Sequence, residues 1–318
     1  MNFNFSLIYL LNNIAKQNNA MKTFLLILLS TLITASCTME QSKTFDLQGH
    51  RGARGLLPEN TIPSFLIAID HGVDTIEFDL VVTKDRQILI SHEPWFHHHF
   101  STKPDGTPVT EEEQMEYNIF EMTYAETQEF DVGTRGHVNF PNQQPMEVTK
   151  PLMRDAIRAI EAYVQEMNLD PVQYNIETKS NPEQYGEFYP YPDEYAELLF
   201  EELKLLHTEF DLFDRIIIQS FDPATLIEFR KLQPEIRQAI LVNTDDPMDE
   251  YLDALGYTPE IWSPNFRLIT PEMVETAHEK GMEVIPWTIN TVDEMRRQLN
   301  MGVDGIITDY PDSAAVLR

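Results

Sequence analysis

The sequence predicts a single (β/α)₈ (TIM) barrel over residues 38–318, and two observations support this prediction. Eight short apolar runs, typical of buried strands, alternate with amphipathic helical patterns over roughly 270 residues. No linker-like stretch divides these runs into domains. Strands that alternate with helices favour a parallel sheet, and eight such units fit a closed barrel better than an open sheet.

Each unit of the barrel can be placed on the sequence. The expected strands are residues 45–49, 73–83, 173–178, 215–221, 237–242, 260–265, 283–289 and 303–309. Helical patterns occupy residues 60–72, 151–168, 191–209, 222–233, 270–281 and 291–302. Several begin at Thr, Asp or Pro and end at Gly, as capped helices do. Residues 243–257 carry a weaker pattern, which predicts one short crossover.

One segment breaks the alternation. Residues 93–150 are polar, turn-rich and aromatic, which indicates an insertion between the second strand and its helix. Barrel enzymes place their active sites and long loops at the carboxyl ends of the strands, so we expect this insertion to shape substrate access. Its three consecutive histidines, 97–99, could not all converge in an extended segment, and we expect a solvated loop there.

The first 37 residues predict an export signal of the lipoprotein type. Residues 21–37 combine Lys22, an apolar core of about a dozen residues, small residues and Cys37, the single cysteine of the chain. The pattern starts so directly at Met21 that it suggests an over-extended start before that residue. We expect lipidation of Cys37 and a membrane-anchored protein that faces the periplasm or the cell surface. Cleavage without lipidation, giving a periplasmic or secreted protein, and a cytoplasmic location stay open.

Composition limits the partners. The chain has 52 acidic and 23 basic residues, with a formal net charge of −29. Such a surface repels anions and argues against nucleic acid as a partner, whereas it favours a cation. We therefore expect a small-molecule substrate and contact with a membrane only through the lipid anchor.

Three acidic residues sit on strands that are otherwise apolar. Glu77 and Asp79 lie two positions apart on the second strand, so their side chains share one face, and Glu177 lies near the end of the third. Buried acids need a positive partner. Three converging carboxylates form an oxygen site suited to one Ca²⁺ or Mg²⁺ ion, and zinc is disfavoured.

Positive and titratable residues lie at the same strand ends. Arg51 and Lys179 add two cations near the carboxylates, which leaves a charge balance that can receive an anion such as a phosphate. His50 ends the first strand, and His92 follows the continuation of the second at residues 86–91. Imidazole titrates near neutral pH, so these two histidines are candidates for general base and general acid.

Several short motifs follow one another along the predicted barrel: GHRG, PENT, IEFDLVVTKD, ISHEP, NIETK, QSF, PWTIN and GVDGIITDYP. Together they resemble the glycerophosphodiester phosphodiesterase family. The resemblance implies a (β/α)₈ barrel that hydrolyses glycerophosphodiesters to glycerol 3-phosphate and an alcohol. It also implies that residues after ISHEP correspond to the small insertion of the family.

The family motifs assign roles to individual positions. The resemblance implies proton acceptor His50, proton donor His92, metal ligands Glu77, Asp79 and Glu177, phosphate-binding Arg51 and Lys179, a supporting Glu59, and Trp287 against the glycerol. Asp commonly follows the second histidine in the family, whereas Glu93 follows it here. This difference preserves charge and affects only local geometry. Asp309, in the last motif, is a further candidate for the site.

Two other functions stay open on the sequence alone. One is a phospholipase C/D-like lyase that stops at a cyclic phosphate, because the attacking group could be the glycerol 2-hydroxyl instead of water. The other is a surface-anchored barrel that binds its ligand without turnover, against which the two histidines argue. The sequence leaves undecided the alcohol head group, the choice between Ca²⁺ and Mg²⁺, and the oligomeric state.

Overall fold

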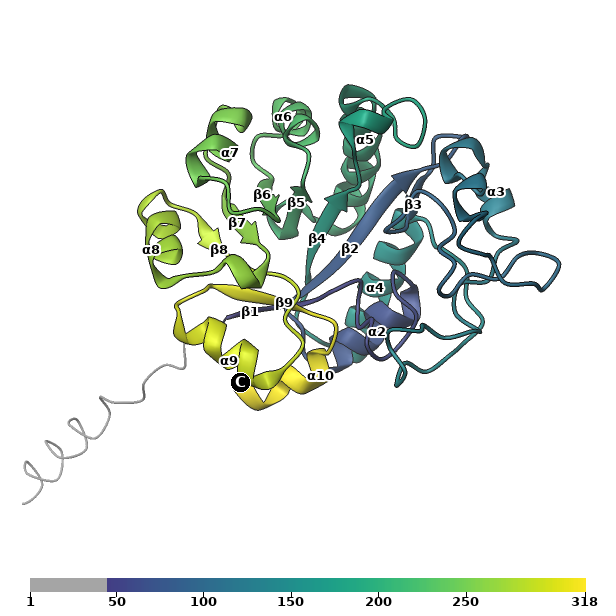
Figure 1. Cartoon of the computed structure of the whole chain (residues 1–318), viewed down its shortest axis with the longest axis horizontal. Coiled ribbons are helices and arrows are strands. Elements are labelled where there is room, and N and C mark those ends of the chain that lie inside the picture. Colours follow the sequence, from purple (N-terminus) through teal and green to yellow (C-terminus); the bar gives the residue numbers. More distant parts are fainter. Residues whose placement is uncertain (1–44) are drawn as a thin grey trace, which may run out of the picture. The chain divides into compact units, whose positions relative to one another are not determined.

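Eight parallel strands form the inner wall of the protein, which we describe from a computed structural model for residues 45–318 (Figure 1). The strands are β1 (Asp46–Gly49), β2 (Thr75–Val82), β4 (Gln173–Thr178), β5 (Ile216–Ser220), β6 (Arg237–Val242), β7 (Ile261–Pro264), β8 (Glu283–Val284) and β9 (Gly305–Thr308). Their order is β8-β7-β6-β5-β4-β2-β1-β9, with every neighbour in this path parallel.

The two ends of this strand path meet through backbone hydrogen bonds. The Asp304 N–H donates to the Val284 carbonyl at 2.9 Å, and the Ile307 N–H donates to the Pro286 carbonyl at 3.0 Å. The Ile289 N–H donates back to the Ile307 carbonyl at 2.9 Å. These bonds join the β8 region to β9, so the predicted (β/α)₈ fold is confirmed.

Strand β8 is much shorter than the expected 283–289. Pro286 has no N–H to donate, which interrupts a regular ladder. Pairing with β7 nevertheless continues, since the Ile285 N–H donates to the Trp262 carbonyl and the Trp287 N–H to the Pro264 carbonyl, both at 3.1 Å. The segment therefore keeps its place in the wall and still brings Trp287 to the barrel mouth.

Helices cover the outside of the barrel (Figure 1). They are α2 (Ile62–Asp70), α4 (Met153–Met167), α5 (Pro192–Phe210), α6 (Pro223–Leu232), α7 (Met248–Leu255), α8 (Pro271–Glu279), α9 (Val292–Asn300) and the unexpected short α10 (Pro311–Ala314). The weak pattern at 243–257 is indeed a short helix, α7. On α4, Ala156, Ile157, Ile160 and Val164 are buried at helical spacing, which is how an amphipathic helix packs on a sheet.

Residues 93–150 link β3 (Ile88–Ile90), which pairs antiparallel with β2, to helix α4. They contain short helices, including α3 (Tyr124–Thr127), and a separate buried apolar cluster. Phe96 and Phe130 stack in this cluster with ring centroids 4.0 Å apart. The segment lies beside the barrel in Figure 1 and shares this cluster with Val81 of β2 and Leu89 of β3.

Residues 97–99 lie in a loop, as predicted, but this loop is a turn and not an extended, fully solvated segment. The Phe100 and Ser101 N–H groups both donate to the His97 carbonyl, at 3.4 and 3.1 Å. These bonds form a turn, so consecutive side chains no longer point to opposite sides. All three histidines are partly buried.

The barrel interior contains an apolar layer and a chain of amides. Ile217, Ala239, Ile261, Ile285 and Ile307 form the apolar layer. Beside it, the Asn175 Nδ2 donates to the Gln48 Oε1 at 2.7 Å and to the Gln219 Oε1 at 3.1 Å. Buried amides need such partners. The chain ends at the barrel mouth, where the Gln219 Nε2 donates to a Glu77 carboxylate oxygen at 2.9 Å.

The predicted export signal, including Met21 and Cys37, lies outside the described residues. Within residues 45–318, no helix combines the length and the apolar character that a bilayer span requires.

Candidate active site

Three carboxylates meet at the mouth of the barrel. Glu77 and Asp79 come from β2, and Glu177 from β4 pairs directly with Asp79 in the strand register. One oxygen from each lies within 4.8 Å of the others. Their exposed fractions are 1%, 0% and 7%, so this is a buried acidic cluster. The spacing of two along β2 places Glu77 and Asp79 on the same side of the strand, as the sequence predicted.

The electrostatics of this cluster call for a cation. Burial raises the pKa of Glu77 well above its usual range, and repulsion from Asp79 and Glu177 raises it further. Within residues 45–318, the buried Oδ1 of Asp79 has no hydrogen-bond partner. Three oxygen donors with one of them unsatisfied fit a hard divalent ion such as Ca²⁺ or Mg²⁺.

Two cationic side chains already partly balance this charge. The Arg51 Nε lies 3.4 Å from the Asp79 Oδ2, and the Lys179 Nζ lies 2.7 Å from the Glu177 Oε1 and 3.8 Å from the Asp79 Oδ1. Burial alone would lower the pKa of Lys179, but Glu177 and Asp79 outweigh it and raise this pKa. Both side chains therefore stay charged beside the cluster and can meet an anion.

The backbone at Arg51 also serves the cluster. Arg51 has a φ of 50°, in the left-handed region, and its N–H donates to the Glu77 Oε2 at 2.8 Å. Gly52 follows with a φ of 85°, and a Cβ there would lie 2.6 Å from Ser64 on α2. Only glycine fits that close approach. The last glycine of GHRG is therefore needed for the backbone path, while His50 and Arg51 carry the polar side chains.

Two neutral side chains hold the carboxylates in place. The Asn60 Nδ2 donates to the Asp79 Oδ2 at 2.8 Å, and the Gln219 Nε2 donates to the Glu77 Oε1. Asn60 belongs to the PENT motif and Gln219 to QSF, yet neither residue was predicted to take part in the site. Their position inside recognised motifs was the available signal.

His50 is held by an acid from the other end of the chain. Its Nδ1 lies 2.6 Å from the Asp309 Oδ1. Because an ionised carboxylate only accepts, Nδ1 carries the proton and Nε2 keeps a free lone pair. Burial lowers the pKa of His50 to about 4, although the Asp309 charge opposes this shift. His50 is thus a neutral imidazole at neutral pH and can accept a proton.

Asp309 is itself clamped. It accepts from the Arg54 Nε at 2.9 Å and from the Asn290 Nδ2 at 2.7 Å. Burial would raise the pKa of Asp309, but His50 and Arg54 lower it overall, so the carboxylate stays ionised. Asp309 was a secondary candidate in the sequence, and Arg54 was missed because an arginine in a loop carries no signal without its distant partner.

His92 lies in the same cavity as His50. Its Nδ1 is 2.6 Å from the Glu93 Oε1, and 30% of its side chain is exposed. Both histidines line a cavity of ≈ 210 Å³ together with Glu77, Glu177 and Trp287. The two histidines, predicted from the sequence as an acid–base pair, are therefore brought to one site.

Glu59 and Trp287 occupy different parts of the site. Glu59 accepts from the Arg51 Nη1 at 2.7 Å and lies 3.7 Å from the Arg54 Nη1, so it holds the arginines. Trp287 lines the cavity; its Nε1 donates to the Ser263 carbonyl at 2.9 Å, and its ring contacts that of Phe221 edge-on. Glu59 thus acts on the site through arginine, while Trp287 faces the cavity.

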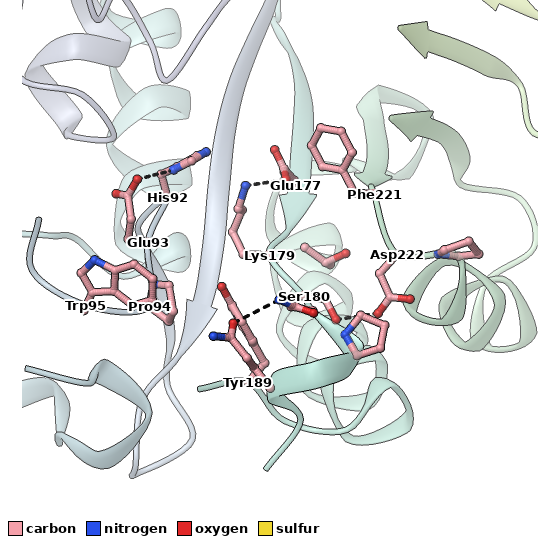
Figure 2. Close-up of a pocket in the computed structure, with 15 residues that line it drawn as sticks. His92, Glu93, Pro94, Trp95, Glu177, Lys179, Ser180, Tyr189, Phe221 and Asp222 are labelled. Carbon is pink, nitrogen blue, oxygen red and sulfur yellow. Dashed lines mark hydrogen bonds and ion pairs between the residues drawn. The ribbon is translucent and has the colours of Figure 1, made fainter. Parts of the chain in front are cut away.

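A second, larger cavity of ≈ 640 Å³ adjoins the first. Figure 2 shows His92 and Glu93 on one side of it and Glu177 with Lys179 on the other. Trp95, Tyr189 and Phe221 are among its lining residues. Because His92, Glu177 and Phe221 line both cavities, the two spaces form a continuous region at the barrel mouth.

Comparisons with known proteins agree with this geometry. Residues 50–313 match the model of the glycerophosphoryl diester phosphodiesterase family. The chain is 29% identical to a glycerophosphodiester phosphodiesterase of Bacillus altitudinis over 273 residues, which are 85% of this chain and 96% of that protein.

Solved structures show the same fold. A candidate glycerophosphoryl diester phosphodiesterase from Silicibacter pomeroyi has a TM-score of 0.75 and 28% identity, and the match covers 86% of this chain and 93% of that one. An Oleispira antarctica phosphodiesterase, solved in complex with its product sn-glycerol-3-phosphate, has a TM-score of 0.66 and 23% identity. That match covers 85% of this chain and 96% of the other and supports the fold alone.

Divalent cations should stabilise the protein through the acidic cluster. A ligand at 100 times its Kd that binds only the folded state adds about 2.7 kcal/mol to the free energy of unfolding. We expect Ca²⁺ or Mg²⁺ to raise the midpoint of thermal unfolding, and Glu177→Gln to reduce that rise, as measured by calorimetry. Glu197→Gln, which changes an exposed carboxylate on α5, should respond like the wild type. An equal rise in all three proteins would place the ion elsewhere.

Proposed function

The chain belongs to the glycerophosphoryl diester phosphodiesterase family and hydrolyses glycerophosphodiesters to glycerol 3-phosphate and an alcohol; we propose that it does so with one divalent cation and a histidine pair. The observation that best supports this proposal is the shared cavity. His50, His92, Glu77 and Glu177 all line one space of ≈ 210 Å³, with Arg51 at its wall. General base, general acid, metal ligands and a phosphate-binding cation are thus within reach of one bound diester.

The cation would be held by Glu77, Asp79 and Glu177, and oxygen ligands favour Ca²⁺ or Mg²⁺. When bound, it would supply positive charge to the phosphate oxygens. Arg51 and Lys179 add charge from the protein itself and orient the phosphate by hydrogen bonds. The Glu59 carboxylate keeps the Arg51 guanidinium fixed at 2.7 Å, so this orientation is set before the substrate arrives.

His50 and His92 would divide the proton transfers. His50 is neutral and has its Nε2 lone pair free, because Asp309 holds the proton on Nδ1, so it is suited to deprotonate the attacking group. The Glu93 Oε1 lies 2.6 Å from the His92 Nδ1 and orients the ring, and His92, as the other histidine of the cavity, is placed to protonate the leaving alkoxide. The attacking group is water or the glycerol 2-hydroxyl, and the second route passes through a cyclic phosphate.

The two cavities would receive the two halves of the substrate. Trp287 lines the smaller one and offers an apolar face to the glycerol. The leaving alcohol departs beside the acid that protonates it, and His92 opens toward the larger cavity shown in Figure 2. Aromatic rings and carboxylates line that space, which leaves room for head groups of different sizes.

The two histidines provide the direct test of the mechanism. His50→Ala and His92→Ala should each lower kcat by about 10²-fold or more, because each removes a proton-transfer group. The measurement is release of glycerol 3-phosphate and of any cyclic phosphate from a panel of glycerophosphodiesters. His71→Ala serves as the control, since His71 caps α2 away from the cavities. Full activity of His92→Ala would refute its role, and a cyclic phosphate as the end product would favour the lyase alternative.

The pH dependence of kcat/KM should reflect the lowered pKa of the buried base His50. His50 must be unprotonated to accept a proton, so activity is present above its pKa and is lost as the pH falls through that value. Since burial lowers this pKa to about 4, the acid limb of kcat/KM should lie near pH 4, well below the ordinary histidine range. The profile is measured with saturating cation, so that the carboxylates are not titrated. An acid limb near pH 6.5 would contradict the assignment of His50 as the base.

We further propose that the protein is exported and anchored through lipidated Cys37, so that it acts on substrates outside the cytoplasm. The support is the sequence pattern at residues 21–37. Cells fed a labelled fatty acid should incorporate label into the wild-type chain and none into Cys37→Ala. Label that persists in Cys37→Ala, or that is missing from both, would rule out lipidation at this residue.

A further inference from the structure

Three consecutive histidines converge on the surface of the insertion. The turn at residues 97–101 brings the rings of His97, His98 and His99 together, with centroid separations of 4.6, 4.5 and 4.3 Å. One ring nitrogen from each lies within 4.8 Å of the others. We propose that these three histidines form a second metal site, specific for a nitrogen-preferring ion such as Zn²⁺ and separate from the carboxylate site.

The hydrogen bonds around the rings leave lone pairs free on His98 and His99, whereas an ion on His97 would replace the hydrogen bond that its Nδ1 accepts. The Nδ1 of His98 lies 2.9 Å from the Gln114 Oε1, an amide oxygen that only accepts, so His98 keeps an unprotonated Nε2. The His97 Nδ1 lone pair accepts the N–H of His99 at 3.1 Å. The ring of His99 makes no hydrogen bond to the rest of residues 45–318. An outer partner that orients a histidine, as Gln114 does, is typical of metal sites.

The donor set distinguishes this site from the carboxylates of the barrel. Zn²⁺, Ni²⁺ and Cu²⁺ bind well to imidazole nitrogens, whereas Ca²⁺ and Mg²⁺ bind preferentially to carboxylate oxygens. Zinc binds histidine nitrogen at about 2.0–2.1 Å, so tetrahedral ligands lie about 3.4 Å apart. The rings would have to rotate on binding to bring their nitrogens to that spacing. Three histidines then leave a fourth position for water, as in open zinc sites.

The surroundings carry both charges, with Arg51 and Arg54 beside Glu59 and Glu93, and border the active site. The carboxylates of Glu111, Glu93 and Glu59 act electrostatically on His99, and all three favour a cation there. His97 and His99 line a cavity of ≈ 670 Å³ that also contains Arg51 and Glu59. An ion on the histidines would fix the turn and add positive charge to the wall that the insertion contributes to this cavity.

The backbone of the histidine turn is held by hydrogen bonds and by apolar packing. The Arg135 Nη1 donates to the His98 carbonyl at 3.1 Å and to the Ser101 carbonyl at 2.8 Å, which ties down the backbone of the turn. Phe100 is buried next to it and belongs to the apolar core of the insertion. The ligands are thus presented by a preorganised turn, which lowers the cost of binding an ion.

Zinc binding to the purified chain tests the proposal. Equilibrium dialysis against Zn²⁺, with excess Mg²⁺ to occupy the carboxylates, should find one tightly bound Zn²⁺ per wild-type chain. Gln114→Leu removes the group that orients His98 and should weaken this binding about 10-fold. His99→Gln removes a ligand and should weaken it further. His71→Gln, a histidine outside the cluster, should bind as the wild type does.

Two further measurements separate the possible failures. Thermal unfolding without metal shows whether His99→Gln is folded, and Gln114→Leu, which leaves all three histidines in place, provides an independent variant. Glu77→Gln should lose hydrolysis but still bind Zn²⁺ at the histidines. Loss of the proposed activity can therefore be distinguished from loss of the histidine site. Equal Zn²⁺ affinity in the wild type and His99→Gln, or no bound Zn²⁺ in the wild type, would overturn the proposal.

Discussion

Burial of three carboxylates in one barrel mouth is the constraint on which the rest of the site depends. Glu77, Asp79 and Glu177 are almost fully removed from water, and their mutual repulsion would be very unfavourable without compensation. Two cationic side chains compensate part of this repulsion: Arg51 forms a salt bridge with Asp79, and Lys179 forms one with Glu177. One carboxylate oxygen, the Asp79 Oδ1, still lacks a hydrogen-bond donor in the described part of the chain. A divalent ion is the group that would complete this balance.

Many neighbouring features are explained by that balance. Arg51 adopts a left-handed backbone because its N–H must reach Glu77 while its side chain turns to Glu59 and Asp79. Gly52 is needed next to it because α2 approaches too closely for any Cβ. The GHRG motif therefore meets two requirements: Gly52 allows the close approach of α2, and Arg51 places a positive charge beside the carboxylates.

The sequence predicted those parts of the protein whose signal is local. Strands and helices follow from periodicity, and Glu77 and Asp79 stood out as acids on an otherwise apolar strand. The extent of β8 was wrong because a proline changes the ladder while the pairing continues. The convergence of the histidines at 97–99 was not predicted, because it depends on a turn that the residue pattern does not indicate. Arg54 was missed because its carboxylate partner lies 255 positions away.

The amide chain inside the barrel has a fixed direction. It begins at the Asp46 Oδ2, which accepts from the Gln48 Nε2 at 2.7 Å, and ends at Glu77. Both of these carboxylates accept in the structure, so the sense of donation must reverse between them, and it reverses at Asn175. Asn175 donates both hydrogens of its Nδ2, and its own Oδ1 is buried without a hydrogen-bond partner among residues 45–318. An aspartate of the same shape would only accept, which would turn both glutamine carboxamide oxygens toward the carboxylates of Asp46 and Glu77, so the Glu77 carboxylate at the barrel mouth requires an amide at position 175.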